Sequence, residues 1–381
     1  MERADLGALL RWTGCAEERG GWCFLCAADW GPDDRAAANE QLAVAAAMPA
    51  PKTGWLCLRT GGTRGGVRFA RHDERTLASA ADGFVRHFGF DRVNAINLLP
   101  AWHVGGLMPH VRSALTGGDC RPWNWSRLAA GDCPDLPDRS DGWTVSLVPT
   151  QLQRLLSTDV TREWMRGFRL ILLGGGPVWP ALADAAAARR LPVTLSYGMT
   201  ESAAVVTAQR TEDFAAGDRS CGRALPHACV TVTAAGLIRV AGNSVFRGYF
   251  PQSRKADGFV SGDLGRLDEN GRLHVAGRND SVIITGGKKV APEAVEAVLR
   301  RGGFGEVAVI GVPDPVWGEA VVACHPAEEP LPDISRATAG LAPHERPKRF
   351  VPVAPWPRDA QGKLDLSALR ACVMGKEEKT S

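Results

Sequence analysis

A glycine- and threonine-rich stretch near residue 60 has the composition of a phosphate-binding loop. It reads TGGTRGGVR from Thr60 to Arg68 and follows the strand-like run WLCLR. Glycines let backbone N–H groups approach phosphate oxygens, while threonine hydroxyls and arginine guanidinium groups add donors and positive charge. The Walker pattern G-x-x-x-x-G-K-[ST] is missing from the sequence, which excludes a P-loop kinase. Taken alone, the stretch fits a flexible surface turn equally well.

Four further motifs follow this stretch in order along the chain. SYGMTE ends at Glu201 after a predicted strand, and SGDLGRLDENGRLHVAGR occupies residues 261–278. NDSVIITGGKKVAPEAVE comes directly afterwards, and RDAQGKLDLSAL contains Lys363. With the glycine-rich stretch, these motifs resemble the adenylate-forming superfamily of acyl- and aryl-CoA ligases, nonribosomal peptide adenylation domains and luciferases. The match runs from Thr60 to Leu369.

Other blocks resemble one branch of that superfamily more closely, the o-succinylbenzoate–CoA ligases of menaquinone and phylloquinone biosynthesis. The blocks are GGVRFARH, LLPAWHVGGLMPHVRSALTGG, SLVPTQLQRLL and LILLGGGPVWP. The resemblance implies an AMP-forming acid–thiol ligase that uses ATP, Mg²⁺, CoA and a small-molecule carboxylic acid. The acid first forms an acyl-adenylate and releases pyrophosphate, and the CoA thiol then displaces AMP. Because charge builds on the phosphates, we expect mainly electrostatic stabilisation.

The resemblance assigns catalytic roles by motif position. Lys363 would neutralise carboxylate and phosphate oxygens during adenylation, although a lone lysine is usually a solvated surface group. Thr200 would contact the α-phosphate. Glu201 would help to coordinate Mg²⁺, a hard cation that prefers carboxylate and phosphate oxygens.

The same resemblance assigns the nucleoside end of the site. Tyr197 would lie against the adenine, and Asp263 would accept hydrogen bonds from the ribose hydroxyls with help from Arg278. A carboxylate suits a vicinal diol because its oxygens only accept. The full implied nucleotide set is Thr60, Gly61, Gly62, Thr63, Gly65, Arg68, Gly175, Ser196, Tyr197, Gly198, Asp263 and Arg278.

An acid with two carboxylates needs a partner for the carboxylate that is not activated. The resemblance places Arg112, nine positions after His103, toward the acyl pocket, where a buried cation would be the natural partner. His103 would pack against the aromatic acid or gate its entry. Both residues are open to a purely structural interpretation, because such side chains on a helix often only satisfy local contacts.

Glycines are implied in the remaining parts of the site. Gly174 and Gly176 would form, with Gly175, the floor between acyl pocket and adenine, although a plain strand-to-helix turn would look the same. Asp280 falls at the position of the family's hinge, and Gly286 and Gly287 would line the CoA tunnel. Rotation about such a hinge could set turnover.

Three positions in the phosphate stretch and one near the acyl site depart from the family pattern. A Ser or Thr is usual where Arg64 stands, a proline where Val67 stands and a lysine where Arg68 stands. Arginine keeps the charge, so we expect altered nucleotide affinity rather than inactivity. Gly105 replaces the serine of the usual H-V-S-G.

The elements that must position these residues predict an α/β fold. From Gly54, short apolar runs alternate with helical patterns, which is the rhythm of a mostly parallel sheet flanked by helices. Such sheets bind ligands at the carboxyl ends of their strands. After about Thr207, short runs separated by AAG and DENG turns indicate an antiparallel β subdomain. A helix is predicted from Pro292 to Arg301.

The predicted organisation is an N-terminal AMP-binding domain over 1–278, with its β subdomain at about 208–278, and a small mobile α+β C-terminal domain over 279–381. A length of 381 residues agrees with two to three domains. No internal repeat is found.

Composition narrows the classes of partner. The net charge of +3 is scattered, which argues against nucleic acid, and no apolar run approaches a membrane span. Ten cysteines, mostly single, suit a reducing compartment, and a start without an apolar core predicts a cytoplasmic protein. Cys23 and Cys26 form a C-x-x-C spacing that more simply marks structural thiols than a redox or zinc site. The sequence leaves a homo-oligomer open.

Three functions stay open at this point. The first is an o-succinylbenzoate–CoA ligase, and the second is a CoA ligase for another aryl or fatty acid. The third is a catalytically silent paralogue that binds adenylates or a partner, against which the presence of Glu201, Asp263 and Lys363 argues. A free-standing adenylation domain that loads a carrier protein is also conceivable.

Overall fold

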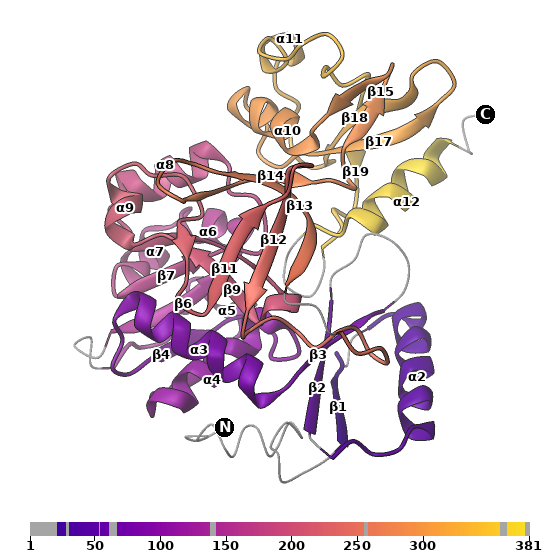
Figure 1. Cartoon of the computed structure of the whole chain (residues 1–381). Coiled ribbons are helices and arrows are strands. Elements are labelled where there is room, and N and C mark those ends of the chain that lie inside the picture. The colour runs from indigo at the N-terminus through magenta and orange to yellow at the C-terminus, as the bar shows by residue number, and fades with distance from the viewer. Residues whose placement is uncertain are drawn as a thin grey trace.

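The computed structural model describes residues 21–27, 30–52, 54–60, 67–137, 142–254, 258–358 and 364–377. Within these residues the chain forms three sheets in its first 278 positions and a fourth sheet near its C-terminal end (Figure 1). The predicted α/β fold with a smaller α+β part at the C-terminal end is confirmed.

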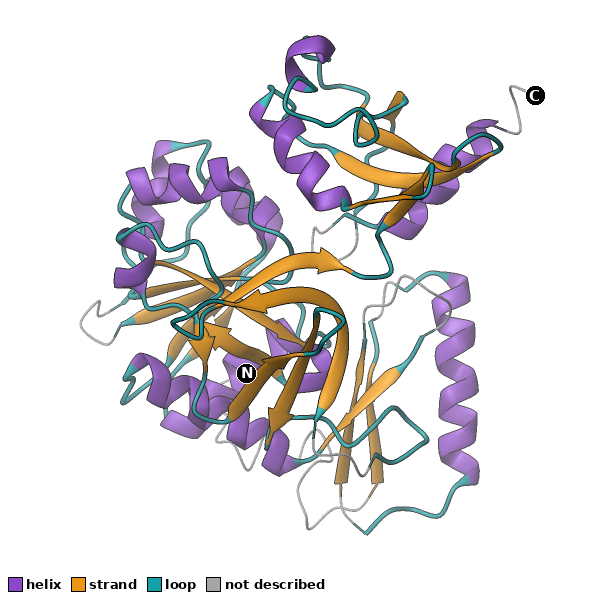
Figure 2. Cartoon of the chain, turned by 45° about the horizontal axis from the view of Figure 1, so that its top comes forward, coloured by secondary structure: helices purple, strands orange, loops and turns teal. Residues whose placement is uncertain are grey.

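The first sheet carries the strand that leads into the glycine-rich stretch. It contains β1 (Gly21–Leu25), β2 (Gly54–Arg59) and β3 (Phe69–His72), with β1 parallel and β3 antiparallel to β2. The helix α2 (Pro32–Ala47) runs alongside it (Figure 2). Phe24 packs edge-on against both Phe69 and Phe250, which ties this sheet to a distant segment of the chain. Cys23 and Cys26 are free thiols here, and burial raises the pKa of each, so neither has the lowered pKa of a reactive cysteine.

The central sheet has seven strands in the order β10-β9-β8-β7-β6-β4-β5. Its strands β5, β4, β6, β7 and β8 are parallel, whereas β9 and β10 continue the sheet antiparallel. The bounds are β4 (Asn94–Asn97), β5 (Cys120–Pro122), β6 (Trp143–Leu147), β7 (Leu170–Leu173), β8 (Val193–Met199), β9 (Ala204–Ala208) and β10 (Arg223–Ala224).

Helices cover both faces of this sheet, and β7 shows why its sequence is apolar throughout. Leu170 and Leu172 join the core under α3 (Glu74–Phe88) and α4 (Val104–Thr116), while Ile171 and Leu173 join the core on the opposite face. Successive side chains of a strand point to opposite faces, so a doubly covered strand must be apolar at every position. The other helices are α5 (Trp125–Ala129), α6 (Pro149–Leu155), α7 (Asp159–Met165), α8 (Pro180–Ala188) and α9 (Thr211–Ala215).

The antiparallel β subdomain is a four-stranded sheet in the order β11-β12-β13-β14. Its strands are β11 (Ala228–Val232), β12 (Leu237–Gly242), β13 (Phe259–Leu267) and β14 (Leu273–Arg278). It begins at Ala228 rather than near residue 208, because β9, α9 and β10 still belong to the central sheet and its cover.

The C-terminal part is built on the sheet β16-β15-β18-β17, with β19 parallel to β18. The predicted helix from Pro292 to Arg301 is α10, with an apolar face that includes Val295 and Leu299 in the core. The bounds are β15 (Ile283–Thr285), β16 (Lys288–Val290), β17 (Ala308–Asp314), β18 (Gly318–Pro326), α11 (Ile334–Ala337), β19 (Arg349–Val353) and α12 (Leu366–Glu377). Helix α10 lies next to β14. In the described part of the chain, every helix is too short or too polar to cross a bilayer.

The start of α4 depends on a close backbone approach at Gly106. A Cβ at this position would lie 2.1 Å from the carbonyl oxygen of Pro100 and 2.4 Å from that of Leu99. At the neighbouring Gly105, an added Cβ would meet only the Leu99 side chain, at 3.2 Å.

Gly106→Ala should therefore destabilise the protein by about 2 kcal/mol or more, since backbone rather than a flexible side chain must move. Gly105→Ala is the matched control and should change the free energy of unfolding much less. Urea denaturation of both variants checks this. Equal losses for the two would contradict the close approach at Gly106.

Candidate functional site

The SYGMTE motif forms a strained turn at the end of β8. The strand passes through Gly198 into a 3₁₀ turn over Thr200–Ser202 and returns as β9. A Cβ at Gly198 would lie 2.0 Å from the carbonyl oxygen of Ala204, so only glycine fits. Ala203 and Ala204 have φ of 53° and 77°, a conformation that is costly for residues with a Cβ and that clusters at functional sites. The turn leaves Thr200 and Glu201 nearly buried at the edge of the sheet.

The Glu201 carboxylate is held by a tyrosine that the sequence analysis did not single out. The Tyr249 hydroxyl donates to Glu201 Oε1 at 2.6 Å, and the Arg68 guanidinium lies over the Tyr249 ring, 4.5 Å from its centroid. Burial and the nearby carboxylate raise the Tyr249 pKa, so the phenol stays a neutral donor. Within the described residues, no donor reaches Glu201 Oε2. The geometry thus joins the end of the glycine-rich stretch to the motif carboxylate.

Thr60 is fixed to the same strand connection. Its N–H donates to the Arg68 carbonyl at 2.9 Å, which closes the base of the stretch between β2 and β3. Gly61, Gly62, Thr63 and Gly65 lie outside the described residues, and so does Lys363.

A fully buried histidine lies beneath the Thr200 turn. His72 Nε2 is 2.8 Å from the Thr200 carbonyl oxygen, and its Nδ1 is 3.1 Å from Thr76 Oγ1. Burial lowers the His72 pKa to about 4, partly offset by the bond to Thr200 and the charge of Asp73. The neutral ring therefore donates to the carbonyl that positions the turn.

The second cluster of charged groups lies where β13 pairs with β14. Asp263 is opposite Arg278 in this register, and the Tyr197 hydroxyl donates to Asp263 Oδ2 at 2.6 Å. Arg278 Nη1 is 3.4 Å from Asp263 Oδ1, and its other nitrogens bind Asp280 at 2.9 and 3.0 Å. Ser261 Oγ accepts from the Asp263 N–H at 3.1 Å. The structure thus joins three of the predicted nucleoside residues with the predicted hinge residue.

Tyr197, which binds Asp263, and Tyr249, which binds Glu201, are the only two tyrosines in the chain. Each donates to a carboxylate that the sequence analysis assigned to the site. The rarity of tyrosine beside twelve tryptophans and twelve phenylalanines was the signal that could have pointed to Tyr249. Where a phenyl ring would serve for packing, a hydroxyl indicates a specific acceptor.

The GGG segment after β7 lies beside Ser196 of β8, and its role as a floor between acid and adenine stays a prediction. The Ser196 hydroxyl donates to the Leu173 carbonyl at 3.1 Å, and a Cβ at Gly174 would lie 2.8 Å from that hydroxyl oxygen. Gly175 has a φ of 76°, which favours glycine, whereas Gly176 would tolerate a side chain next to Pro149 at 3.7 Å. Backbone conformation therefore favours glycine at Gly175, and the Ser196 hydroxyl crowds a side chain at Gly174.

His103 and Arg112 lie at opposite ends of α4 rather than together. His103 precedes the first turn of the helix and is half-buried. Nine residues of helix separate their backbones by about 13 Å. Arg112 is 4% exposed in the core, with its guanidinium 3.9 Å from the centroid of the Phe84 ring of α3. Burial lowers the Arg112 pKa to about 9.

The surroundings of Arg112 are those of a core residue. Its titratable neighbours Cys120 and His227 are both neutral at pH 7, because burial raises the Cys120 pKa to about 12 and lowers the His227 pKa to about 4. Its guanidinium packs on Phe84 of α3, and its predicted role as the partner of the second carboxylate of the acid stays a prediction.

Gly286 and Gly287 form the tight turn between β15 and β16. Their φ values of 53° and 75° lie in the left-handed region that such hairpins require. The Gly286 N–H donates to the Trp317 carbonyl at 2.8 Å. Asp280 begins the same segment just after β14 and is bound to Arg278.

Comparison with known proteins agrees with this arrangement. The family model described as AMP-binding enzyme matches residues 22–250, and the model described as AMP-binding enzyme C-terminal domain matches residues 295–363. The chain belongs to the AMP-binding enzyme family. The first matched range includes the Thr200 turn, and the second begins within α10.

Individual relatives point to CoA ligases. A 2-succinylbenzoate–CoA ligase of Listeria monocytogenes serotype 4b is 31% identical over 282 residues, which cover 71% of this chain and 60% of the relative. The chain therefore spans about three fifths of that ligase. An indoleacetate–CoA ligase of Aromatoleum aromaticum is 29% identical over 355 residues, or 86% of this chain and 68% of that protein.

A solved structure is similar as well. The o-succinylbenzoate CoA synthetase of Bacillus subtilis, in complex with the acyl-adenylate OSB-AMP, gives a TM-score of 0.70 at 26% identity, over 81% of this chain and 67% of that chain. The same synthetase is known in complex with ATP and a magnesium ion.

The buried His72 makes stability depend on pH. Its folded pKa is lowered from 6.5 to about 4, so its contribution is present above pH 6.5 and is lost as the pH falls through 4. The slope of the free energy of unfolding against pH should therefore include up to one proton from this group, about 1.4 kcal/mol per pH unit at most.

His72→Gln removes this proton while keeping a polar side chain. We expect a shallower slope between pH 6.5 and 4 in the variant, measured by urea denaturation at several pH values. An unchanged slope would show that His72 titrates alike in the folded and unfolded chain.

Proposed function

We propose that the protein is an ATP-dependent acid–CoA ligase that activates o-succinylbenzoate. The observation that carries the proposal is the pair of tyrosine-bound carboxylates, Glu201 and Asp263, placed beside β8. Glu201 is bound by Tyr249, whose ring carries Arg68 of the glycine-rich stretch, and Asp263 lies next to Arg278, as expected for the phosphate and ribose ends of one nucleotide. Similarity to 2-succinylbenzoate–CoA ligases supports the choice of acid.

In the first half-reaction, a carboxylate oxygen of the acid attacks the α-phosphorus of ATP. The bond from that phosphorus to the bridging oxygen breaks, pyrophosphate leaves and the acyl-adenylate remains. Thr60 and Arg68 would bind the outer phosphates, together with the proposed Gly61, Gly62, Thr63 and Gly65, and Thr200 would contact the α-phosphate. Lys363 would neutralise the oxygens that exchange partners.

In the second half-reaction, the CoA sulfur attacks the acyl carbonyl carbon. The bond to the AMP oxygen breaks, AMP leaves, and the thiol proton passes to solvent. Gly286 and Gly287 would line the path of the CoA chain. We propose domains over 1–278 and 279–381 that move about Asp280 between the two steps.

The residues around Glu201 fit Mg²⁺. Mg²⁺ usually takes one or two protein carboxylates and completes its octahedral shell with phosphate oxygens and water. Glu201 Oε2 offers one such oxygen, while Tyr249 fixes the other. In the described residues, no cluster of three His, Cys, Asp or Glu side chains forms a complete protein-only site. When bound, the ion would neutralise charge on the phosphates.

At the nucleoside end, the phenol of Tyr197 binds Asp263 Oδ2. Oδ1 is shared with Arg278 at the longer distance of 3.4 Å and is the oxygen best placed for a ribose hydroxyl. Gly175, Ser196 and Gly198 would supply the backbone around the adenine. His103, Arg112, Gly174 and Gly176 remain the proposed lining of the acid pocket. We propose a cytoplasmic location.

A second acid class is supported by the indoleacetate–CoA ligase, whose alignment covers more of this chain than that of the Listeria ligase. The test is mass-spectrometric detection of acyl-CoA and AMP after incubation with ATP, Mg²⁺, CoA and single acids. The acids are o-succinylbenzoate, indoleacetate, benzoate and a medium-chain fatty acid. We expect o-succinylbenzoyl-CoA with equimolar AMP.

A thioester of another acid would keep the chemistry and overturn the substrate. Absence of product and of AMP with every acid would contradict the ligase and favour a silent adenylate-binding protein.

Tyr249→Phe should raise the Mg²⁺ concentration needed for half-maximal activity by about tenfold. The variant keeps the ring under Arg68 but loses the hydroxyl that orients Glu201, and loss of such an outer partner typically weakens metal binding by 10- to 100-fold. Titration of adenylate formation with Mg²⁺ measures the effect.

Tyr197→Phe is the matched control, because it removes the same group from the nucleoside end. It should raise the KM for ATP with little change in the Mg²⁺ requirement. Equal Mg²⁺ shifts in the two variants would contradict the assignment of Glu201 to the metal.

A further inference from the structure

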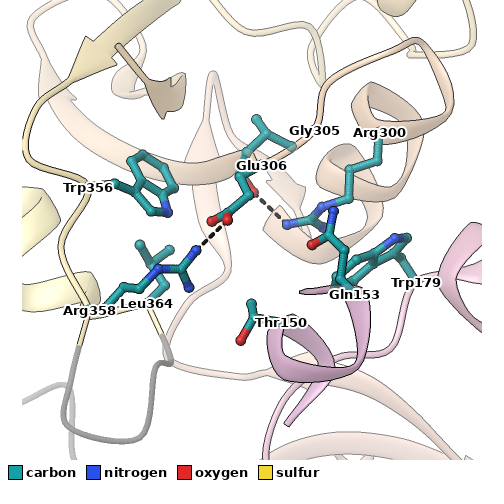
Figure 3. A pocket seen from close by; sticks show the side chains of 10 residues that line it. Thr150, Gln153, Trp179, Arg300, Gly305, Glu306, Trp356, Arg358 and Leu364 are labelled. Atoms are coloured by element: carbon teal, nitrogen blue, oxygen red, sulfur yellow. Dashed lines mark hydrogen bonds and ion pairs between the residues drawn. The ribbon is translucent and has the colours of Figure 1, made fainter. Parts of the chain in front are cut away.

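The C-terminal part meets the large domain around a small cavity of about 50 Å³ (Figure 3). Thr150 and Gln153 of α6 and Trp179 line it from the large domain, and Arg300, Glu306 and Arg358 line it from the C-terminal part. Arg300 extends toward Trp179 across this boundary, with its guanidinium carbon 4.8 Å from the centroid of the indole ring.

The Arg300 guanidinium is held rigidly on its own side. Its Nη2 donates to the Val307 carbonyl at 2.6 Å, and its Nη1 is 3.3 Å from Glu296 Oε2. The side chain is only 16% exposed. A planar cation that is already oriented and largely desolvated stacks on an aromatic ring with little further loss of entropy.

Trp179 is equally well fixed on the opposite side. It lies at the N-terminal end of α8, directly before Pro180, and packs against the core on that face of the central sheet. It also follows the segment of Gly174 to Gly176 by three residues. The contact therefore joins α10 to the strand connection that runs beside Ser196 of the candidate site.

Arg358 and Leu364 form the edge of the C-terminal part that faces the large domain. They pair in an isolated β-bridge and line the same cavity as Thr150 and Gln153 of the large domain. Arg358 is also paired with Glu306. In contrast, the turn at Gly286 packs against Trp317 and does not line the cavity. In this orientation the two ends of the segment expected to carry Lys363 face the large domain.

We propose that Trp179 and Arg300 are positioning residues that hold the C-terminal domain in the orientation used for acyl-adenylate formation. This inference rests on the proposed ligase function. Without the contact, the C-terminal domain would no longer be held with its Arg358–Leu364 edge toward the large domain, as the first half-reaction requires. The second half-reaction, which is proposed to use the Gly286 turn, would not be affected. Loss of the contact therefore slows the first half-reaction selectively.

The test is to measure both half-reactions separately in Trp179→Leu. We expect the rate of acid-dependent exchange of labelled pyrophosphate into ATP to fall by about 3- to 10-fold. This is the change in an equilibrium expected from the loss of a partly desolvated cation–π contact. Thioester formation from supplied acyl-adenylate should be unchanged or faster. Trp179→Phe, which keeps an aromatic face, should recover most of the exchange rate.

Trp123→Leu is the matched control. Trp123 packs against the same core as Trp179 and carries the Arg127 guanidinium 4.4 Å from its ring centroid, but both residues belong to the large domain and neither lines the cavity. It should leave the ratio of the two half-reactions unchanged. Arg300→Lys, which keeps a cation beside Glu296, should reproduce the selective loss if Trp179→Leu folds poorly.

Limited trypsin digestion gives a readout that does not need activity. Cleavage at Arg278, Lys288 or Lys289 should be about threefold faster in Trp179→Leu than in the wild type, and unchanged in Trp123→Leu. Equal loss of both half-reactions, or unchanged ratio and cleavage, would overturn the positioning role. If the wild type activates no acid but Trp179→Leu is still cleaved faster, the proposed ligase function is contradicted while the contact between Trp179 and Arg300 is supported.

Discussion

The geometry of the candidate site depends on one constraint, the shift in register within the pairing of β8 with its antiparallel neighbour β9. The shift falls between Tyr197 and Gly198, and the chain then turns back through Ala203 and Ala204 with positive φ. A residue with a Cβ at Gly198 would collide with the Ala204 carbonyl. The core on both faces of the sheet stabilises this costly backbone, and the buried His72 fixes it from below.

The electrostatics of the site depend on two carboxylates, Glu201 and Asp263, each of which accepts a hydrogen bond from a phenol. Asp263 also pairs with Arg278 at 3.4 Å. Burial and the carboxylates raise the pKa of both phenols, so they stay neutral donors that do not themselves neutralise the carboxylates. A lysine in the place of Tyr249 would compete with a divalent cation for Glu201. Neutral donors orient the carboxylate and preserve its charge for a ligand.

The sequence predicted the parts of the fold that depend on local pattern. Helix α10 has the predicted bounds because Pro292 begins it and the apolar spacing of Val295 and Leu299 continues it. The parallel sheet follows from apolar runs such as β7. The bond from Tyr249 to Glu201 could not be predicted, because 48 residues separate the partners and their approach depends on how the first sheet docks.

Arg112 shows what the sequence leaves open. Its position after the HVGG block predicted a partner for the acid, which stays a prediction, whereas its contact with Phe84 depends on the packing of α3 on α4, which the sequence alone does not give. Strand register places Asp263 opposite Arg278, and the Tyr197 hydroxyl reaches Asp263 from β8, so residues of separate motifs meet through tertiary packing.

Arg278 and Arg300 connect the large domain to the C-terminal part at two separate places. Arg278 binds Asp280 more closely than Asp263, at 2.9 and 3.0 Å against 3.4 Å. A ribose that claims Asp263 Oδ1 would therefore weaken the longer contact first and leave the junction at Asp280 intact. Arg300, in contrast, meets Trp179 far along the chain from that junction, so its contact can open without breaking a bond in the nucleotide site. In the proposed ligase, separation of these two contacts would let the C-terminal domain move while the nucleotide stays bound.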